Sequence, residues 1–258
     1  MPDKSLSYLP FDILIQSKPG PIHSDYKKLD YLIKDYSISY GNSASILFRD
    51  VEETSSIYKE HKTLAIAPSY ETIIKDTALL ATLGKFRDGF EALAYNTDEV
   101  DNIMDHFDGE ILQAETATES NFWINYQNYD VLHFAMHALV DNKESERSKL
   151  VFTLGQDTLY DNYLHNFELY NADMKAKMVV LSACNTGDGE LASGEGVKSM
   201  AQAFTYAGAQ SVVMSHWRVN DKASSIMMDY FYKYLANGEQ KDNALRLAKL
   251  EYLEKLHH

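Results

Sequence analysis

Two short, mostly apolar runs lead to residues whose side chains can carry out nucleophilic chemistry. Residues 131–135 are followed by His137, and residues 179–181 are followed three positions later by Cys184, the single cysteine of the chain. If both runs are parallel strands of one sheet, they end at the same edge and bring the imidazole and the thiol together. A histidine beside a cysteine takes its proton or stabilises the thiolate, which activates the cysteine as a nucleophile. The pattern therefore predicts a catalytic dyad of His137 and Cys184.

Two other interpretations of these residues stay open at the level of sequence. A lone cysteine after an apolar strand is often a small buried hydrophobe without catalytic function. His133 lies four positions before His137 and shares its face if both belong to one strand, so His133, His137 and Cys184 are an alternative zinc site. The sequence supplies no fourth ligand, and we expect His133 to be a packed or hydrogen-bonded strand residue and the protein to hold no metal.

The stretch after Cys184 is rich in glycine. Residues 187–196 contain four glycines in ten positions and follow a predicted strand, so we expect a long loop at the carboxyl edge of the sheet. The stretch lacks the Gly-Lys-Ser/Thr ending of a phosphate loop, and Glu190 and Glu195 would repel phosphate. We expect it to shape a substrate cleft, and to be mobile or folded over that cleft in the isolated domain.

A third segment reaches the same edge after the next predicted strand. Trp217 can form an apolar wall there, and Asp221 can present a carboxylate. Asp221 also precedes a predicted helix over 222–236, where an aspartate is a favourable cap or first-turn residue. Both roles hold together only if the carboxylate also faces the cleft.

The elements that must position these residues alternate between strand and helix, which predicts an α/β fold with a mostly parallel sheet. A polar linker over 108–120 divides the chain into halves with about four strands each. We expect strands at 10–16, 31–40, 63–68, 110–114, 129–136, 150–154, 178–183 and 211–216, and helices at 71–82, 86–107, 117–127, 196–207, 222–236 and 242–255. Gly208 occupies the position where a glycine ends a helix.

Composition sets limits on function. The 258 residues are 45% hydrophobic and 24% charged, which is ordinary for a globular protein. With 24 Lys+Arg against 38 Asp+Glu, the net charge of −14 argues against binding to nucleic acid or to an anionic membrane. The single cysteine excludes an intrachain disulfide. The sequence contains no apolar run of membrane-spanning length and no signal peptide at its start, so we expect a cytoplasmic protein.

The same residues, in order along the chain, resemble the CHAT domain, a caspase-like peptidase domain found with tetratricopeptide repeats and related to separases. The separation of 47 residues between His137 and Cys184 (184 − 137) also resembles the caspase spacing. The similar segments are His137-Ala138, 181–187 (Leu-Ser-Ala-Cys-Asn-Thr-Gly), 194–197, 203–204, 207–209, 211–213, 217–221 (Trp-Arg-Val-Asn-Asp) and 244–248, with 9–12, 31–36 and 115–119 in the first half.

The resemblance implies a caspase-like α/β/α sandwich without a cofactor. Residues 1–115 would be a non-catalytic, pseudo-caspase half and residues 116–258 the catalytic half. His137 would be the acid/base and Cys184 the nucleophile, with the backbone N–H groups of Ala138 and Cys184 forming the oxyanion hole. Trp217 and Asp221 resemble the separase stretch whose aspartate binds a basic side chain.

These implications predict a cysteine endopeptidase that cleaves a protein or peptide substrate after a basic residue. Its regulation would come from partner or repeat domains outside residues 1–258, such as a tetratricopeptide-repeat region. The alternative function is a catalytically silent caspase-fold module that binds another protein.

Overall fold

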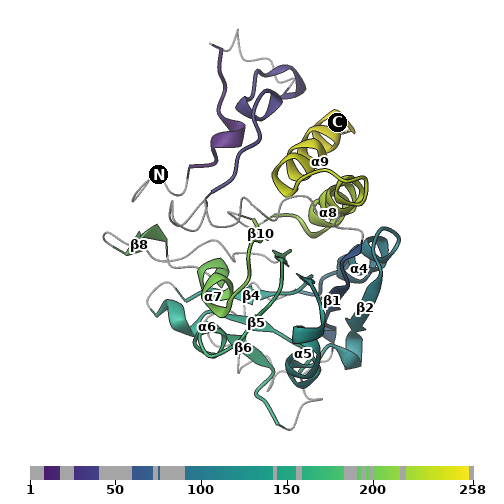
Figure 1. Cartoon of the computed structure of the whole chain (residues 1–258), viewed down its shortest axis with the longest axis vertical. Helices are drawn as coiled ribbons and strands as arrows, with labels where there is room; N and C mark the ends of the chain where they lie inside the picture. The colour runs from purple at the N-terminus through teal and green to yellow at the C-terminus, as the bar shows by residue number, and fades with distance from the viewer. Residues whose placement is uncertain are drawn as a thin grey trace.

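The fold is an α/β arrangement with strands at its centre and helices around them (Figure 1). It comes from a computed structural model. The structure describes residues 9–17, 26–40, 60–71, 75, 91–141, 144–154, 159–182, 191–192, 196–197, 200–215 and 219–255.

Five parallel strands form the central sheet, in the order β10-β7-β3-β1-β2. Their short apolar runs are typical of strands covered on both faces. The predicted α/β fold with a parallel sheet is therefore confirmed. The strands are β1 (Thr63–Ala67), β2 (Gly109–Gln113), β3 (Val131–Phe134), β7 (Met178–Leu181) and β10 (Val212–Met214).

Helices cover both faces of this sheet, as the alternation of side chains along β3 shows. Val131 packs in a core cluster with side chains of α8 and α9, whereas Leu132 and Phe134 pack in a second cluster with side chains of α5 and α7. The architecture is thus a caspase-like α/β/α sandwich. The helices are α4 (Asn96–Met104), α5 (Glu119–Asn125), α6 (Asn166–Leu169), α7 (Met200–Ala207), α8 (Asp221–Ala236) and α9 (Lys241–Lys255).

Both halves of the chain contribute to the one central sheet. β1 and β2 belong to residues 1–115, and β3, β7 and β10 belong to residues 116–258. The assignment of these halves as non-catalytic and catalytic stays a prediction.

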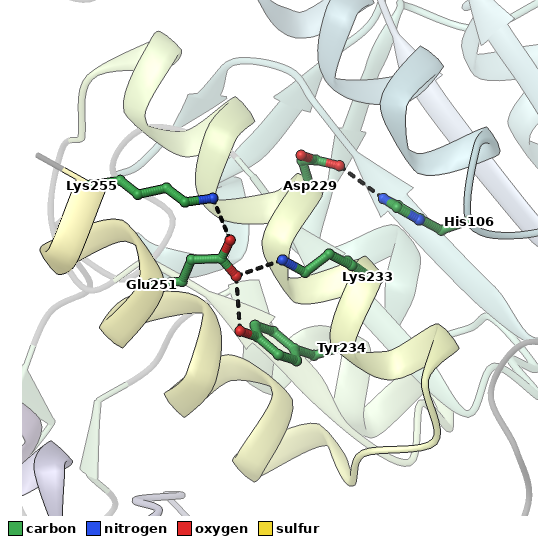
Figure 2. Close-up of polar contacts among 6 residues, drawn as sticks. All are labelled: His106, Asp229, Lys233, Tyr234, Glu251 and Lys255. Carbon is green, nitrogen blue, oxygen red and sulfur yellow. Dashed lines mark hydrogen bonds and ion pairs between the residues drawn. The ribbon is translucent and has the colours of Figure 1, made fainter.

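Polar contacts join α4, α8 and α9 on one side of the sheet (Figure 2). His106, just after α4, places its Nε2 2.8 Å from Asp229 Oδ1 on α8. Glu251 on α9 accepts hydrogen bonds from Lys233 and Tyr234 on α8. These contacts fix the relative positions of the three helices by side-chain hydrogen bonds in addition to apolar packing.

Two smaller sheets accompany the central one. β4 (Ala138–Leu139), β5 (Lys149–Val151) and β6 (Tyr163–His165) form an antiparallel sheet in that order. β8 (Leu191–Ala192) and β9 (Gly196–Val197) form an antiparallel pair. The stretch 187–196, expected as a long loop, therefore contains the short strand β8 and the first residue of β9, while its residues 187–190 and 193–195 lie outside the described residues. In the register of this pair, Leu191 is opposite Val197 and Ala192 is opposite Gly196.

The strands expected at 10–16 and 31–40 are wrong. The chain forms the 3₁₀ helices η2 (Phe11–Ile13) and η4 (Leu32–Lys34), and a single bridge joins Ile15 to Tyr31. Pro10 precedes η2 with φ −76°, and the fixed φ of proline favours the start of a helical turn. The other 3₁₀ helices are η3 (Tyr26–Lys28), η8 (Ala114–Thr116), η9 (Tyr126–Asn128) and η10 (Ser145–Arg147).

Two helices begin later than the sequence predicts. The helix expected over 86–107 begins at Asn96, and residues 91–95 precede it without helical structure. The helix expected over 196–207 begins at Met200, because Gly196 and Val197 pair as β9. Most of the helix expected over 71–82 lies outside the described residues.

Candidate active site

His137 lies between the central sheet and the smaller antiparallel sheet. β3 ends at Phe134, and His137 directly precedes β4. Its backbone carbonyl accepts a hydrogen bond from the Val151 N–H at 3.0 Å, and its own N–H donates to the Tyr70 hydroxyl at 3.0 Å. These two hydrogen bonds hold its backbone just beyond the carboxyl end of the middle strand, and the residue is 8% exposed.

The imidazole of His137 is oriented by a backbone carbonyl. Its Nε2 lies 2.6 Å from the carbonyl oxygen of Glu91. Because a carbonyl oxygen can only accept, Nε2 carries the proton in this hydrogen bond. In the neutral ring, Nδ1 is then the basic nitrogen, which suits the residue to take a proton from a thiol.

Asn96 ties together the strand ends around His137. This first residue of α4 is buried, and its Nδ2 donates to the carbonyls of Pro68 at 2.9 Å and Ala135 at 3.4 Å. It therefore links the chain after β1 to the chain after β3. Sequence reasoning missed Asn96 because it placed the residue inside a longer helix, although asparagine favours helix ends over helix interiors.

The strand that leads to Cys184 is the neighbour of β3. In their parallel register Phe134 is opposite Leu181. His137 follows Phe134 by three residues, and Cys184 follows Leu181 by three residues. Cys184 and Trp217 both lie outside the described residues.

Ala138 directs its backbone N–H away from β5. Ala138 is opposite Leu150, and the flanking hydrogen bond from Val151 N to His137 O makes this a non-hydrogen-bonded pair. β4 is also the edge strand of its sheet. The Ala138 N–H therefore points to the side of β4 that has no partner strand in that sheet.

Asp221 is the first residue of α8, and Asn220 is the cap that precedes it. The Asn220 side chain accepts from the Ala223 N–H at 3.2 Å, whereas Asp221 Oδ2 accepts from the backbone N–H of Tyr95 at 2.8 Å. Its carboxylate thus lies against the residue that precedes α4. Residues 91–95 form a short segment that contacts His137 through Glu91 and Asp221 through Tyr95.

The side chain of His133 lies on the face of the sheet that α4 and α8 cover. It is fully buried, with Nε2 2.8 Å from Glu99 Oε1 and Nδ1 3.1 Å from the Tyr232 hydroxyl. Burial and the nearby Glu99 carboxylate raise the pKa of Tyr232, so its hydroxyl stays protonated. The expectation that His133 is a hydrogen-bonded strand residue is confirmed.

The zinc alternative lacks the geometry that it assumed. β3 ends at Phe134, so the alternation of a strand does not carry from His133 to His137, and both ring nitrogens of His133 have hydrogen-bond partners. Within the described ranges, no cluster of three or more His, Cys, Asp or Glu side chains is arranged to hold a metal ion.

No helix in the described part of the chain has the length and apolar character needed to cross a membrane.

Comparison with known proteins identifies the family. A comparison with curated protein sequences gives no significant match. The sequence profile of the CHAT domain, a caspase-like peptidase family whose members often occur with tetratricopeptide repeats, matches residues 1–258. A match over the whole chain, on a parallel sheet of the caspase-like type, means that this protein belongs to the CHAT domain family.

Proposed function

We propose that this protein is a cysteine endopeptidase with His137 and Cys184 as its catalytic dyad. The observation that carries the proposal is the register of β3 and β7, in which Phe134 is opposite Leu181. β3 and β7 are parallel and therefore end at the same edge of the sheet, and His137 and Cys184 each follow the paired residue of their strand by three positions in the sequence. The orientation of His137 by the Glu91 carbonyl supports the same role.

The proposed reaction begins at Nδ1 of His137, which takes the proton of the Cys184 thiol. The thiolate attacks the carbonyl carbon of the substrate peptide bond and forms a tetrahedral intermediate. Protonated His137 then gives its proton to the leaving amine as the C–N bond breaks. A water molecule, deprotonated by His137, attacks the acyl-enzyme and releases the acid product and the thiol.

The oxyanion of that intermediate would be bound by the backbone N–H groups of Ala138 and Cys184. The direction of the Ala138 N–H, away from β5, supports this part of the proposal. Each such donor contributes about 2.7–4 kcal/mol to transition-state stabilisation. Ala138 also lies in a strand, and it does not adopt the positive φ that would require glycine.

The test of the dyad combines activity with thiol reactivity. Cys184→Ala should abolish cleavage of a protein or peptide substrate, and His137→Gln should reduce it by about 100- to 10,000-fold, the range for general acid–base catalysis. Alkylation of Cys184 by iodoacetamide in the wild-type protein should proceed at a pH well below that of a free thiol, and His137→Gln should shift this profile to higher pH. His106→Gln is the matched control, since His106 pairs with Asp229 away from this edge.

The alternative is a silent caspase-fold module that binds another protein. In that case Cys184 would be alkylated as slowly as an ordinary thiol, with or without His137. Substrate-independent thiol reactivity therefore separates the two functions before any natural substrate is identified.

We further propose that Asp221 and Trp217 bind the residue before the cleaved bond and favour lysine or arginine there. A carboxylate accepts several hydrogen bonds, so the one from the Tyr95 N–H leaves capacity for a cationic side chain. Asp221→Asn should lower kcat/KM for a basic-P1 peptide by about 10-fold or more while sparing a neutral-P1 peptide. A library of peptides cleaved without any basic preference would leave Asp221 with only its contact to the start of α4.

The proposed peptidase activity would be regulated by a part of the protein or a partner outside residues 1–258. CHAT domains often occur with tetratricopeptide repeats, and we propose that such a region or another partner controls the stretch 187–196 beside the nucleophile. Turnover of one reporter peptide by residues 1–258 and by the protein with its partner region tests this, and equal activity would contradict it.

We also propose that the protein works in the reducing cytoplasm, where a nucleophilic thiol stays reduced.

A further inference from the structure

We propose that Tyr70 is a positioning residue for His137, an inference that rests on the proposed function. Tyr70 lies three residues beyond β1 and is 2% exposed. Its hydroxyl accepts a hydrogen bond from the backbone N–H of His137 at 3.0 Å and donates one to the carbonyl of Val151 at 2.7 Å. One phenol group therefore joins the residue before β4 to the last residue of β5.

The ring of Tyr70 also contacts the ring of His137 directly. The two ring centroids lie 4.7 Å apart, and the ring planes meet at 48°. Tyr70 thus restrains His137 twice, at its backbone through the hydroxyl and at its imidazole through the aromatic ring. The Glu91 carbonyl adds a third restraint at Nε2.

The hydroxyl keeps its proton under all conditions in which the protein would work. Burial raises the pKa of Tyr70, against the weaker lowering effect of the hydrogen bond from the His137 N–H. The neutral hydroxyl can therefore donate to Val151 and accept from His137 at the same time. This double role is possible for tyrosine and lost in phenylalanine.

The position of Tyr70 is itself fixed from neighbouring elements. The N–H of Ser69 donates to Thr153 Oγ1 at 3.1 Å, and Asn96 holds the carbonyl of Pro68 at 2.9 Å. Residues 68–70 are thus attached to α4 and to the chain just after β5. A positioning group must be held by its own surroundings in this way, because its precision passes to the residue that it orients.

Removal of the hydroxyl would leave the buried His137 N–H and the Val151 carbonyl without this partner. The chain between β3 and β4 could then shift, and the imidazole with it. A displacement of about 1 Å in a reacting group can cost about 100-fold in rate. The loss should fall on the chemical step, because Tyr70 contacts His137, the proposed acid/base, whereas the carboxylate of the proposed substrate-binding residue Asp221 accepts from the Tyr95 N–H.

The test compares Tyr70→Phe with Tyr126→Phe in the full chain. Tyr126 is buried in the same core cluster. Its hydroxyl accepts a hydrogen bond from the side-chain Nε2 of its neighbour Gln127 at 3.2 Å. With a basic-P1 reporter peptide, we expect Tyr70→Phe to lower kcat by about 10- to 100-fold with KM within about twofold. We expect Tyr126→Phe to leave both constants unchanged. Equal kcat in the two variants, or a rise in KM without a fall in kcat, would overturn the proposal.

A second measurement separates this proposal from the peptidase function. Nitrogen-15 NMR of the His137 imidazole, assigned with His137→Gln, should show a proton on Nε2 in the wild-type protein and a mixture of tautomers in Tyr70→Phe. If the wild-type protein cleaves no peptide but the tautomer depends on Tyr70, the peptidase function fails and the positioning role stands. An identical tautomer in both proteins overturns the positioning role.

A third measurement needs no variant to fold. In the wild-type protein the amide hydrogen of His137 should exchange slowly with solvent, because it is donated to the Tyr70 hydroxyl. Exchange at the rate of an exposed amide would contradict the hydrogen bond on which the inference depends.

Discussion

At the scale of single residues, Glu251 shows how one carboxylate joins two helices (Figure 2). It accepts from Lys233 Nζ at 2.6 Å and the Tyr234 hydroxyl at 2.8 Å on α8, and from Lys255 Nζ at 2.5 Å on its own helix. Burial acts to raise the pKa of Glu251, but the hydrogen bonds from Lys233, Lys255 and Tyr234 outweigh it and lower the pKa to about 2. The folded protein therefore stabilises the ionised form of Glu251 more than the unfolded chain does.

This lowered pKa predicts a specific dependence of stability on pH. A carboxylate with a depressed pKa contributes stability above its unfolded pKa of about 4.3, and this contribution is lost as the pH falls toward about 2. Glu251→Gln should lower the free energy of unfolding by about 1–2 kcal/mol at pH 7, the scale of hydrogen bonds to a charged group. Between pH 5 and pH 2 the difference from wild type should shrink.

Urea unfolding at several pH values measures this effect, with Glu254→Gln as the control. Glu254 lies on the same helix with its side chain exposed. Loss of stability on acidification that is the same in wild type and Glu251→Gln would show that other carboxylates cause it.

The residues of the proposed site differ in how readily their sequence reveals them. His137 was predictable because it follows an apolar run at a fixed spacing from Cys184. Its partners were not, because Tyr70 and Glu91 lie 67 and 46 residues away along the chain. Glu91 also acts through its backbone carbonyl, and a backbone carbonyl has no signature in the residue type.

At the scale of elements, Gly208 ends α7 in a way that only glycine permits. Its φ is +114°, which confirms the glycine expected after this helix, and a Cβ would lie 2.3 Å from the carbonyl oxygen of Met174. The Met174 N–H in turn donates to the carbonyl of Ala207 at 2.7 Å. The turn after α7 is therefore packed directly against the chain before β7.

Two glycine substitutions separate strain from collision. Gly238 also has a positive φ, +90°, but a Cβ there meets nothing within 4 Å. Gly238→Ala should cost about 1–2 kcal/mol from backbone strain alone. Gly208→Ala should lower the free energy of unfolding by at least about 2 kcal/mol more than Gly238→Ala does. The Met174 carbonyl must move to make room for the Cβ, and this disturbs the hydrogen bond from the Met174 N–H to the Ala207 carbonyl. Denaturant midpoints measure both, and equal losses would mean that the chain before β7 yields freely.

Elements with a long periodic pattern were predictable, and short ones were not. α8 and α9 begin within one residue of the predicted positions, because 15 or 16 residues of helical pattern average out local ambiguity. β4 and η2 have two and three residues, too few to show any period. Their conformations depend on tertiary contacts, such as the pairing of Ala138 with Leu150.

At the scale of the whole molecule, the early part of the chain is attached to the last helix. The segment that contains η2 and η4, purple in Figure 1, lies beside α9. Arg246 on α9 donates through Nε to the carbonyl of Ile33 at 2.7 Å and through Nη2 to the carbonyl of Lys34. Lys249 pairs with Asp12 at 2.5 Å. Charged side chains thus supply much of this long-range attachment.

Removal of one of these side chains should loosen the early segment without unfolding the sheet. In Arg246→Gln, hydrogen exchange at Asp35 and Tyr36, whose amides both donate to Leu32 in η4, should quicken by about 10-fold or more. Exchange in β3 should stay unchanged. Arg147→Gln is the control, because its carboxylate partner Glu144 is three residues away and exposed. An equal increase in β3 would show that the segment and the sheet open as one unit.

The strand order of the central sheet also has a consequence for synthesis. From β1 outward, β3, β7 and β10 are added on one side in the order in which a ribosome makes them. The shortest loop that any of these pairings closes, between Val179 and Val212, spans 33 residues (212 − 179), so no pair can form as a local hairpin. While residues 135–177 are being made, β3 therefore presents an unpaired edge that can associate with other chains. The strand that leads to the proposed nucleophile, β7, is the one that covers this edge, so a nascent chain halted before residue 178 would be left with β3 open to aggregation.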